Sequence, residues 1–264
     1  LDNIEPKYIN SPESNFFKKR NILYNLDKAK ITARKKKNLL FCEGYMDAIS
    51  LYKNGIKSVV APLGTSLTES QLNLSWKFTS KPTVMFDGDK PGIIAAYKVA
   101  IMSLKHISPN KFIQFISLPE KYDPDTFIRD FSFEDLVKIL KKPISLVNFI
   151  FDRASLAYSL NEADDKIKFD KYLDELSDTI NDKKIKYFYK NEFKTLFFKK
   201  IRTKNNHSTI SRQTNQSAAS SIYNKQLLSF IAGFLNHISI RKEIKLIIEN
   251  SKFFDETLQG IFNE

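Results

Sequence analysis

The sequence lacks the residues and motifs on which several common kinds of site depend. It has one cysteine, Cys42, which cannot form a disulfide framework or a multi-cysteine zinc site within this chain. It has no Gly-x-Gly-x-x-Gly and no P-loop motif, so neither dinucleotide binding nor P-loop ATP hydrolysis is expected. The three histidines are scattered along the chain, and none stands in a recognisable catalytic triad.

Long apolar segments are missing as well. No run of apolar residues is long enough to cross a bilayer, and no segment resembles a signal peptide. We therefore expect a cytoplasmic protein that has no membrane partner.

Basic residues exceed acidic ones by a wide margin. The chain has 42 lysines and arginines against 30 aspartates and glutamates, which gives a net charge of +12 over 264 residues. Such a balance favours a polyanionic partner, usually a nucleic acid, although a lysine-rich solvated surface would give the same count. The length allows a sizeable core and more than one domain.

Two short apolar runs each end in acidic residues at a glycine-containing turn. The first covers residues 38–43 and ends at Glu43, and the second covers residues 83–87 and leads into Asp87 and Asp89. An apolar run of this length, followed by a helical pattern, predicts a buried strand of a parallel α/β sheet. Ligands of such sheets bind just beyond the carboxyl ends of the strands. If the strands are neighbours, the acidic side chains converge there.

Clustered carboxylates repel one another unless a cation lies between them. Carboxylate oxygens suit Mg²⁺, which keeps several waters and binds through one or two carboxylates plus substrate phosphates. The alternative is an acidic turn that caps the next helix, because Asp89 precedes Lys-Pro-Gly as an N-cap residue would. Gly88 lets the chain turn sharply between Asp87 and Asp89. With Glu43 at the end of a second strand, we favour the metal site.

The segment from residue 38 to residue 118 is predicted to hold four strand–helix units. We expect strands near 38–43, 58–63, 83–87 and 111–118, and helices near 46–54, 68–78 and 92–106. Gly55 is a candidate C-cap of the first helix, and Thr68 with Gln71 forms a candidate capping box. Right-handed crossovers would make these strands parallel, with their carboxyl ends on one edge. That edge would collect Glu43, Gly64, Thr65, Asp87, Asp89, Asp123 and Asp125.

Four motifs together resemble the TOPRIM region of bacterial DNA primases, in the order and spacing of that family. They lie at residues 43–47, 60–68, 87–92 and 118–125. The resemblance implies a four-stranded, mostly parallel α/β fold that binds Mg²⁺, with Mn²⁺ as a substitute, through catalytic Glu43, Asp87 and Asp89. Asp123 and Asp125 would hold a second ion, with Pro124 fixing a turn between them. Asp47, Gly64, Thr65 and Gly88 would then support the site, whereas by position alone Asp47 could equally be a carboxylate on the surface of a helix.

Residues 6–13 resemble another primase motif, from the core just before the TOPRIM fold. The resemblance implies that Lys7, Tyr8, Asn10 and Lys19 contact nucleotide or template, whereas composition alone would favour a packed loop. Arg20 stands where a glycine is common in the family, which changes the local turn. The basic run at 34–37 is expected to be a solvated hairpin or linker.

The predicted domain organisation follows the same resemblance. We assign residues 1–37 to the end of the upstream core, 38–130 to the TOPRIM domain, and 131–203 to a helical subdomain with helices near 133–140, 143–158, 161–180 and 183–201. Residues 204–221 have linker composition, and 222–264 would begin a helicase-binding helical domain. The chain is expected to be incomplete, with zinc confined to a missing N-terminal module.

The predicted function is primer synthesis during DNA replication. The resemblance implies a Mg²⁺-dependent nucleotidyltransferase that makes short RNA primers on single-stranded DNA from ribonucleoside triphosphates, located in the cytoplasm at the nucleoid and replisome. A replicative helicase would bind through the C-terminal region. The alternatives are another TOPRIM enzyme such as a nuclease, or a catalytically silent fragment that serves as a DNA- or helicase-binding module.

Overall fold

The computed structural model describes residues 14, 17–64 and 66–210, with side chains described as far as residue 202. Contacts divide the chain into two units, Leu1–Lys199 and Lys200–Glu264, and the description below concerns the first unit and helix α9, which continues beyond it. Lys7, Tyr8, Asn10 and Thr65, and the segment from 222 to 264, lie outside the described residues.

A five-stranded sheet with the order β2-β1-β3-β4-β5 forms the centre of the first unit. Its strands are β1 (Leu40–Phe41), β2 (Val59–Val60), β3 (Thr83–Phe86), β4 (Gln114–Ser117) and β5 (Ile144–Ser145). The first four are parallel, as predicted, and β1 lies between β2 and β3. The fifth strand was not predicted: residues 143–158 were expected to be one helix, but β5 runs antiparallel to β4, with Phe115 opposite Ile144, and the helix begins after it at Leu146.

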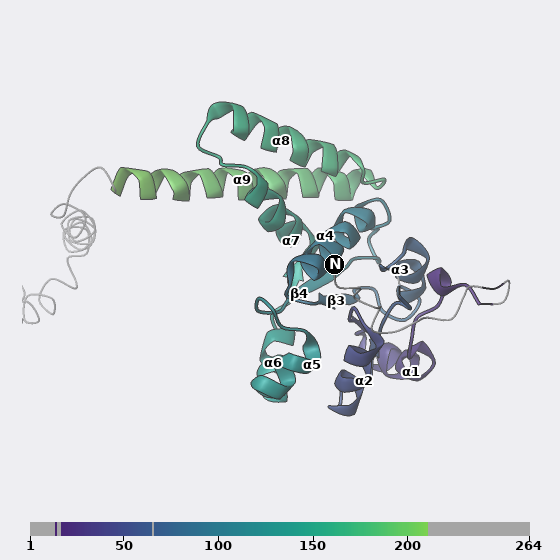
Figure 1. Cartoon of the computed structure of the whole chain (residues 1–264). Coiled ribbons are helices and arrows are strands. Elements are labelled where there is room, and N and C mark those ends of the chain that lie inside the picture. The colour runs from purple at the N-terminus through teal and green to yellow at the C-terminus, as the bar shows by residue number, and fades with distance from the viewer. Residues whose placement is uncertain (1–13, 15–16, 65, 211–264) are drawn as a thin grey trace, which may run out of the picture. The chain divides into compact units, whose positions relative to one another are not determined.

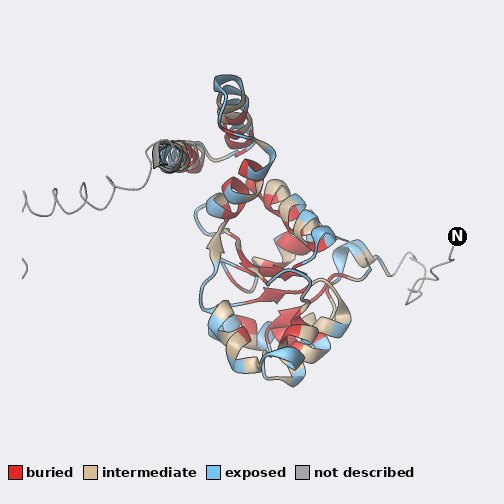
Figure 2. Cartoon of the chain, turned by 60° about the vertical axis from the view of Figure 1, so that its left-hand side comes forward, coloured by how far each residue is buried: buried red, intermediate tan, exposed pale blue. Residues whose placement is uncertain are grey.

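Helices cover both faces of the sheet, so the first unit has the layers of a doubly wound α/β fold (Figures 1 and 2). The helices that carry these layers and the helical remainder are α1 (Leu26–Lys36), α2 (Tyr45–Lys53), α3 (Glu69–Ser75), α4 (Lys90–Leu104), α5 (Pro124–Asp130), α6 (Phe133–Leu140), α7 (Leu146–Ala154), α8 (Ala163–Asp178) and α9 (Lys183–Ile210), with short 3₁₀ turns at Lys19–Asn21 and Ser155–Ala157. In Figure 1, α2, α5 and α6 lie on one side of the strands and α4 and α7 on the other.

Alternation of side chains along the strands supplies a core to each face. On one face, Leu40, Cys42 and Met85 pack with Leu51 of α2 and Leu136 of α6. Cys42, which directly follows β1, is fully buried and packs as a small hydrophobic residue.

On the opposite face, buried aromatic rings join the sheet to α7. Phe115 of β4 stacks on Phe149, with ring centroids 4.1 Å apart. Figure 2 shows the strands as the most buried part of this unit. Burial on both faces is what the short, uniformly apolar strands of a parallel sheet require.

Two local predictions about helix ends are confirmed, and so is the capping role that was the alternative to a metal ligand for Asp89. Thr68 caps α3, because its side chain accepts a hydrogen bond from the Gln71 N–H, and the Gln71 side chain accepts one from the Thr68 N–H. Asp89 caps α4 through the Gly92 N–H, at 2.8 Å. Gly55 follows α2 with a φ of 102°, a left-handed conformation that favours glycine at this point.

Three other predictions need correction. The basic run at 34–37 was expected to be a hairpin or linker, but it ends helix α1, with the Arg34 guanidinium over the Phe78 ring. The Asp-Pro-Asp sequence at 123–125 is the start of helix α5 and not an isolated turn. Helix α9 continues to Ile210, so the first part of the predicted linker, residues 204–210, is helical.

The helical remainder packs through aromatic residues. The fully buried ring of Phe169 in α8 contacts the rings of Phe151, Tyr158 and Phe197. The hydroxyl groups of Tyr97 in α4 and Tyr172 in α8 are hydrogen-bonded at 2.8 Å, which joins this part to the sheet layers. No helix among the described residues is both long and apolar enough to cross a membrane.

Candidate metal centre at the carboxyl edge of the sheet

Neighbouring strands bring Glu43 and Asp87 to the same edge of the sheet. Because β1 and β3 are adjacent and parallel, with Phe41 opposite Val84, the residues that follow the two strands emerge side by side. The Asp87 N–H lies near enough to the Glu43 carboxyl group to lower its pKa, against the larger opposite effect of burial. The carboxyl groups of Glu43 and Asp87, which follow separate strands, therefore lie within electrostatic range of each other.

These two residues each hold a buried oxygen that lacks a partner. Glu43 Oε2 and Asp87 Oδ1 are buried, and neither accepts a hydrogen bond from any described residue. Buried polar atoms are nearly always hydrogen-bonded, so an exception calls for an explanation such as an ion or a ligand. Two unpartnered carboxylate oxygens just beyond the ends of adjacent strands suit a cation.

The other acidic residues at this edge use a carboxyl oxygen to cap a helix. Asp47 Oδ2 accepts a hydrogen bond from the Gly44 N–H at 3.1 Å, at the start of α2. Asp89 accepts one from Gly92 at 2.8 Å, and Asp123 accepts one from the Thr126 N–H at 2.6 Å. Capping fixes the position of each of these side chains while leaving a second oxygen of each carboxyl group available.

The pKa shifts show that the acidic side chains repel one another. Burial raises the pKa of Asp87 to about 7, with further contributions from the charges of Asp47, Glu43, Asp123 and Asp89. The sequence-predicted carboxylates therefore lie within electrostatic range of one another, and a divalent cation would relieve the repulsion.

Asp47 belongs to the same group of charges. Burial raises its pKa to about 6 against the opposing hydrogen bond from Gly44, and the charges of Asp123, Asp125 and Glu43 raise it further. Burial also raises the pKa of Glu43, and the nearby Asp87 N–H offsets part of this effect. Asp47 is thus coupled both to Glu43 and to the aspartates at the start of α5.

The residues present fit a divalent cation. Among the described residues, no three histidine, cysteine, aspartate or glutamate side chains are grouped as a complete metal site. Mg²⁺ does not need such a group, because it is usually held by one or two carboxylates together with water and substrate phosphates. Glu43 and Asp87, whose bare oxygens are hard donors, are the side chains that would hold it.

Asp125, the other predicted ligand of a second ion, is engaged by helix α2. Its Oδ1 accepts a hydrogen bond from Ser50 Oγ at 2.6 Å, and its side chain is exposed. Asp123 stands beside it as the cap of α5. The structure thus brings both residues to the edge of the acidic group, each with one oxygen already in use, and their role as ligands stays a prediction.

Gly88 allows two loops to approach closely. A Cβ atom at this position would collide with the carbonyl group of Pro119, and the Gly88 N–H donates a hydrogen bond to the Tyr122 carbonyl at 2.8 Å. This contact joins the loop that carries Asp87 and Asp89 to the loop that precedes Asp123. The predicted supporting role of Gly88 thus has a physical basis in backbone approach.

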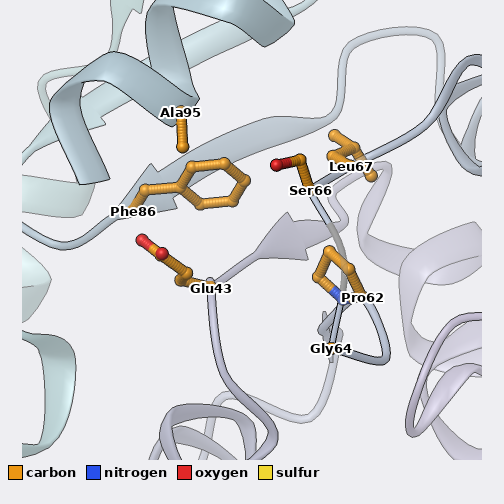
Figure 3. Close-up of a pocket in the computed structure, with 7 residues that line it drawn as sticks. All are labelled: Glu43, Pro62, Gly64, Ser66, Leu67, Phe86 and Ala95. Atoms are coloured by element: carbon orange, nitrogen blue, oxygen red, sulfur yellow. The ribbon is translucent and has the colours of Figure 1, made fainter. Parts of the chain in front are cut away.

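A cavity of about 280 Å³ opens next to Glu43 (Figure 3). Among the described residues that line it, Glu43 is the charged one, and the others are Pro62, Gly64, Ser66, Leu67, Phe86 and Ala95. Figure 3 shows the Glu43 side chain next to the Phe86 ring, with Ser66 and Gly64 on the other wall. Gly64 has a φ of 67°, so the loop after β2 adopts a conformation that disfavours other residues.

Two further residues at this edge were not identified from the sequence. Ser50 holds Asp125, and Arg153 of α7 lines a small hollow together with Asp87 and Ser117. The Arg153 guanidinium donates to Ser117 Oγ at 3.4 Å and lies 5.7 Å from the Phe149 ring centroid. Neither residue stands in a motif, so only the packing of α2 against α5, and of α7 against β4, could have revealed them.

Lys19 is the one predicted nucleotide- or template-binding residue within the described part of the chain. It lies in a 3₁₀ turn, and its backbone carbonyl accepts a hydrogen bond from Gln71 Nε2 at 3.0 Å. The fully buried Gln71 side chain also donates to the Ile22 carbonyl at 2.8 Å. This anchors the segment before α1 to helix α3.

Two family models match the chain. Residues 1–30 match the model described as the N-terminal domain of the DNA primase catalytic core, and residues 40–128 match a model described as Toprim-like. The second match contains the acidic edge from Glu43 to Asp125.

Curated relatives are bacterial DNA primases. The protein from Rickettsia bellii is 32% identical over 263 residues, which cover 98% of this chain and 44% of the relative. The protein from Aquifex aeolicus is 43% identical over 140 residues, which cover 53% of this chain and 28% of the relative. The chain therefore spans less than half of the length of these relatives.

Solved structures share the fold. The E. coli primase catalytic core matches with a TM-score of 0.66 and 30% identity, covering 73% of this chain and 62% of that one. A DnaG primase catalytic domain bound to single-stranded DNA matches with a TM-score of 0.66 and 29% identity, covering 74% and 63%. A DNA primase domain from Pseudomonas aeruginosa gives 0.68 and 27%, covering 75% and 62%.

Proposed function

Because the chain resembles bacterial DNA primases and has a Toprim fold, we propose that it forms part of the catalytic core of a replicative primase. The reaction would be template-directed synthesis of short RNA primers on single-stranded DNA from ribonucleoside triphosphates. The observation that carries the proposal is the pair of unpartnered, buried oxygens of Glu43 and Asp87, just beyond the ends of two adjacent parallel strands.

Glu43 and Asp87 would hold a Mg²⁺ ion, for which Mn²⁺ could substitute, and Asp89 would complete the catalytic set. When bound, such an ion lowers the pKa of an attacking hydroxyl group and neutralises charge on phosphate oxygens. The capped carboxylates of Asp47 and Asp89 keep the field at this edge negative, and Asp123 with Asp125 offers the position for a second ion.

The cavity next to Glu43 supports a role in nucleotide binding. It joins a carboxylate that would hold the metal to an apolar wall formed by Phe86, Leu67 and Pro62. A volume of about 280 Å³ is near the lower end for small-molecule sites, so it suits part of a nucleotide and not a whole one. Lys7, Tyr8, Asn10 and Lys19 are proposed to contact the rest of the nucleotide or the template.

The partners and the location follow from the same proposal. Single-stranded DNA would be the template, and a replicative helicase would bind through the C-terminal region, at 222–264. The protein would act in the cytoplasm at the replisome. Zinc is proposed only for a separate N-terminal module, since Cys42 is buried in β1–β3 packing and is the one cysteine of the chain.

Replacing Glu43 tests the proposal directly. Glu43→Gln keeps the shape of the side chain but removes the charge, so primer synthesis on a single-stranded template should be lost in Mg²⁺ and in Mn²⁺. The matched control is Glu134→Gln, which neutralises an exposed glutamate in the first turn of α6. Synthesis is measured with radiolabelled nucleotides, using the chain alone and as part of its complete gene product.

Each outcome of this assay has a clear meaning. Loss of synthesis in Glu43→Gln, with an unchanged circular dichroism spectrum and an active Glu134→Gln control, supports the metal assignment. Full activity of Glu43→Gln would contradict it. Cleavage of DNA in Mg²⁺ without nucleotides would identify a nuclease instead, and DNA or helicase binding without synthesis in any form would identify a silent binding module.

A further inference from the structure

The outer face of helix α9 carries cations and aromatic rings in alternation. Helices α8 and α9 run side by side, held by Phe169 against Phe197 and by ion pairs from Lys186 to Asp178 and from Lys190 to Asp174 (Figure 1). The face turned away from α8 presents Lys184, Tyr187, Asn191, Lys194 and Phe198, which we call the α9 stripe. Spacings of three and four residues place these side chains in one row.

The rings of the stripe are exposed to a degree unusual for aromatic residues. Tyr187 is 62% exposed and Phe198 is 56% exposed, and the neighbouring Phe188 is 58% exposed. Tyr187 packs edge-on against Phe188, and Phe198 packs against the buried ring of Phe197. These edge-to-face contacts support the rings at the surface, and more than half of each of these three side chains stays exposed.

The charge along the stripe has one sign. Lys184 and Lys194 are exposed, and neither forms an ion pair within the described part of the chain, in contrast to Lys186 and Lys190. The one acidic residue between 183 and 199 is Glu192, which lies beside the stripe and not in it. Acidic residues of α8 neutralise the inner lysines of α9, so the unbalanced positive charge lies outward.

We propose that the α9 stripe is a binding surface for single-stranded DNA, separate from the acidic edge of the sheet. Lysines spaced along a helix attract phosphates, and exposed rings stack on bases of any sequence. A protein partner would need an apolar, largely uncharged patch at its centre, whereas here the rings alternate with lysines. The choice of DNA over RNA rests on the proposed function, while the charge and the rings do not depend on it.

The stripe matches an extended strand in length. From Lys184 to Lys194 and Phe198 the row covers about 20 Å of helix, at a rise of about 1.5 Å per residue. Tyr187 and Phe198 are therefore separated by about 16 Å and would stack on bases that are not adjacent. Lys194 lies between them and would contact an intervening phosphate.

The two kinds of side chain predict different responses to salt. Tyr187→Ala and Phe198→Ala should each weaken binding of a labelled oligothymidylate roughly fivefold or more, because stacking on that ring is lost. The slope of affinity against salt should stay as it is in the original chain. The double variant Lys184→Gln with Lys194→Gln should lower that slope by about 1.4, or about 0.7 for each phosphate contact.

Fluorescence anisotropy over a range of salt concentrations measures both quantities, in EDTA and without nucleotides. The matched control is the double variant Lys168→Gln with Lys171→Gln, which removes the same charge from α8, where each lysine already faces an acidic residue. It should leave the slope nearly unchanged. Thermal melts followed by circular dichroism check that every variant keeps its helices.

Two results would overturn the proposal. If both aromatic variants bind oligothymidylate as tightly as the original chain, the stripe is not a nucleic-acid surface. If oligouridylate binds more tightly than oligothymidylate and loses more affinity in the aromatic variants, the ligand is RNA. Since the assay contains no metal and no nucleotide, its result is independent of the Glu43→Gln test of primer synthesis.

Discussion

At the scale of single residues, the acidic edge divides its carboxylates between two tasks. Asp47, Asp89 and Asp123 each use one oxygen to cap a helix, which fixes them in place. Glu43 and Asp87 retain buried oxygens without a partner among the described residues. This arrangement destabilises the folded state, because like charges lie close together in a partly buried place.

This destabilisation predicts a dependence of stability on pH. The pKa of Asp87 rises from 3.8 to about 7 on folding. The contribution of Asp87 to the free energy of unfolding is therefore most favourable at low pH and is lost as the pH rises towards 7. Asp87→Asn removes the charge, so its melting temperature should exceed that of the original chain at pH 8 and approach it near pH 4. Differential scanning calorimetry at several pH values measures this.

Divalent cations should reduce the destabilisation that the repulsion between these carboxylates causes. Mg²⁺ should raise the melting temperature of the original chain more at pH 8 than at pH 5, because protonated Asp87 competes with the ion. Asp130→Asn, at an exposed site outside the acidic group, is the control and should respond to Mg²⁺ like the original chain. A Mg²⁺ response that is independent of pH, or that survives Asp87→Asn, would contradict the assignment.

At the scale of secondary-structure elements, helix α3 fixes the segment that precedes the sheet. Thr68 caps α3, and its hydroxyl group also donates a hydrogen bond to the Arg20 carbonyl at 2.6 Å. Gln71 completes the capping box and binds the carbonyls of Lys19 and Ile22. The start of one helix thus organises a turn about fifty residues earlier in the chain, as the separations in these hydrogen bonds show.

Removing the Thr68 side chain should weaken both the start of α3 and the attachment of the Arg20 turn to it. Thr68→Ala should lower the free energy of unfolding by about 1 kcal/mol, within a range of about 0.5–2 kcal/mol for lost caps. Urea denaturation followed by circular dichroism measures this change. Thr68→Ser, which keeps the hydroxyl group, should restore most of the stability, and Thr68→Ala with unchanged stability would show that the cap is not important here.

At the scale of the whole molecule, the net charge of +12 predicts binding of single-stranded DNA that weakens steeply with salt. If about six phosphates are neutralised, the affinity should fall roughly 300-fold between about 50 and 200 mM salt. Titration of the complete chain with a labelled oligothymidylate measures the fall. A flat salt response would show that the basic surface is solvated lysine and not a nucleic-acid surface.

Several features were fixed by the sequence because they depend on neighbours in the chain. The parallel strands β1 to β4 follow from short apolar runs that end at turns, and the caps Thr68 and Asp89 follow from local hydrogen bonds. The acidic edge followed from these strands, since parallel strands end on one side of a sheet. Helix α5 was missed although Asp-Pro before Thr126 was a usable capping signal.

Other features were decided by tertiary structure alone. Strand β5 forms because Ile144 and Ser145 meet the open edge of β4, and a two-residue strand has no periodicity that a sequence could reveal. The hydrogen bond from Ser50 to Asp125 depends on the packing of α2 against α5. Which carboxylates cap a helix and which keep an unpartnered oxygen likewise depends on the N–H groups that the fold brings near them. The sequence alone does not distinguish one acidic side chain from another in this respect.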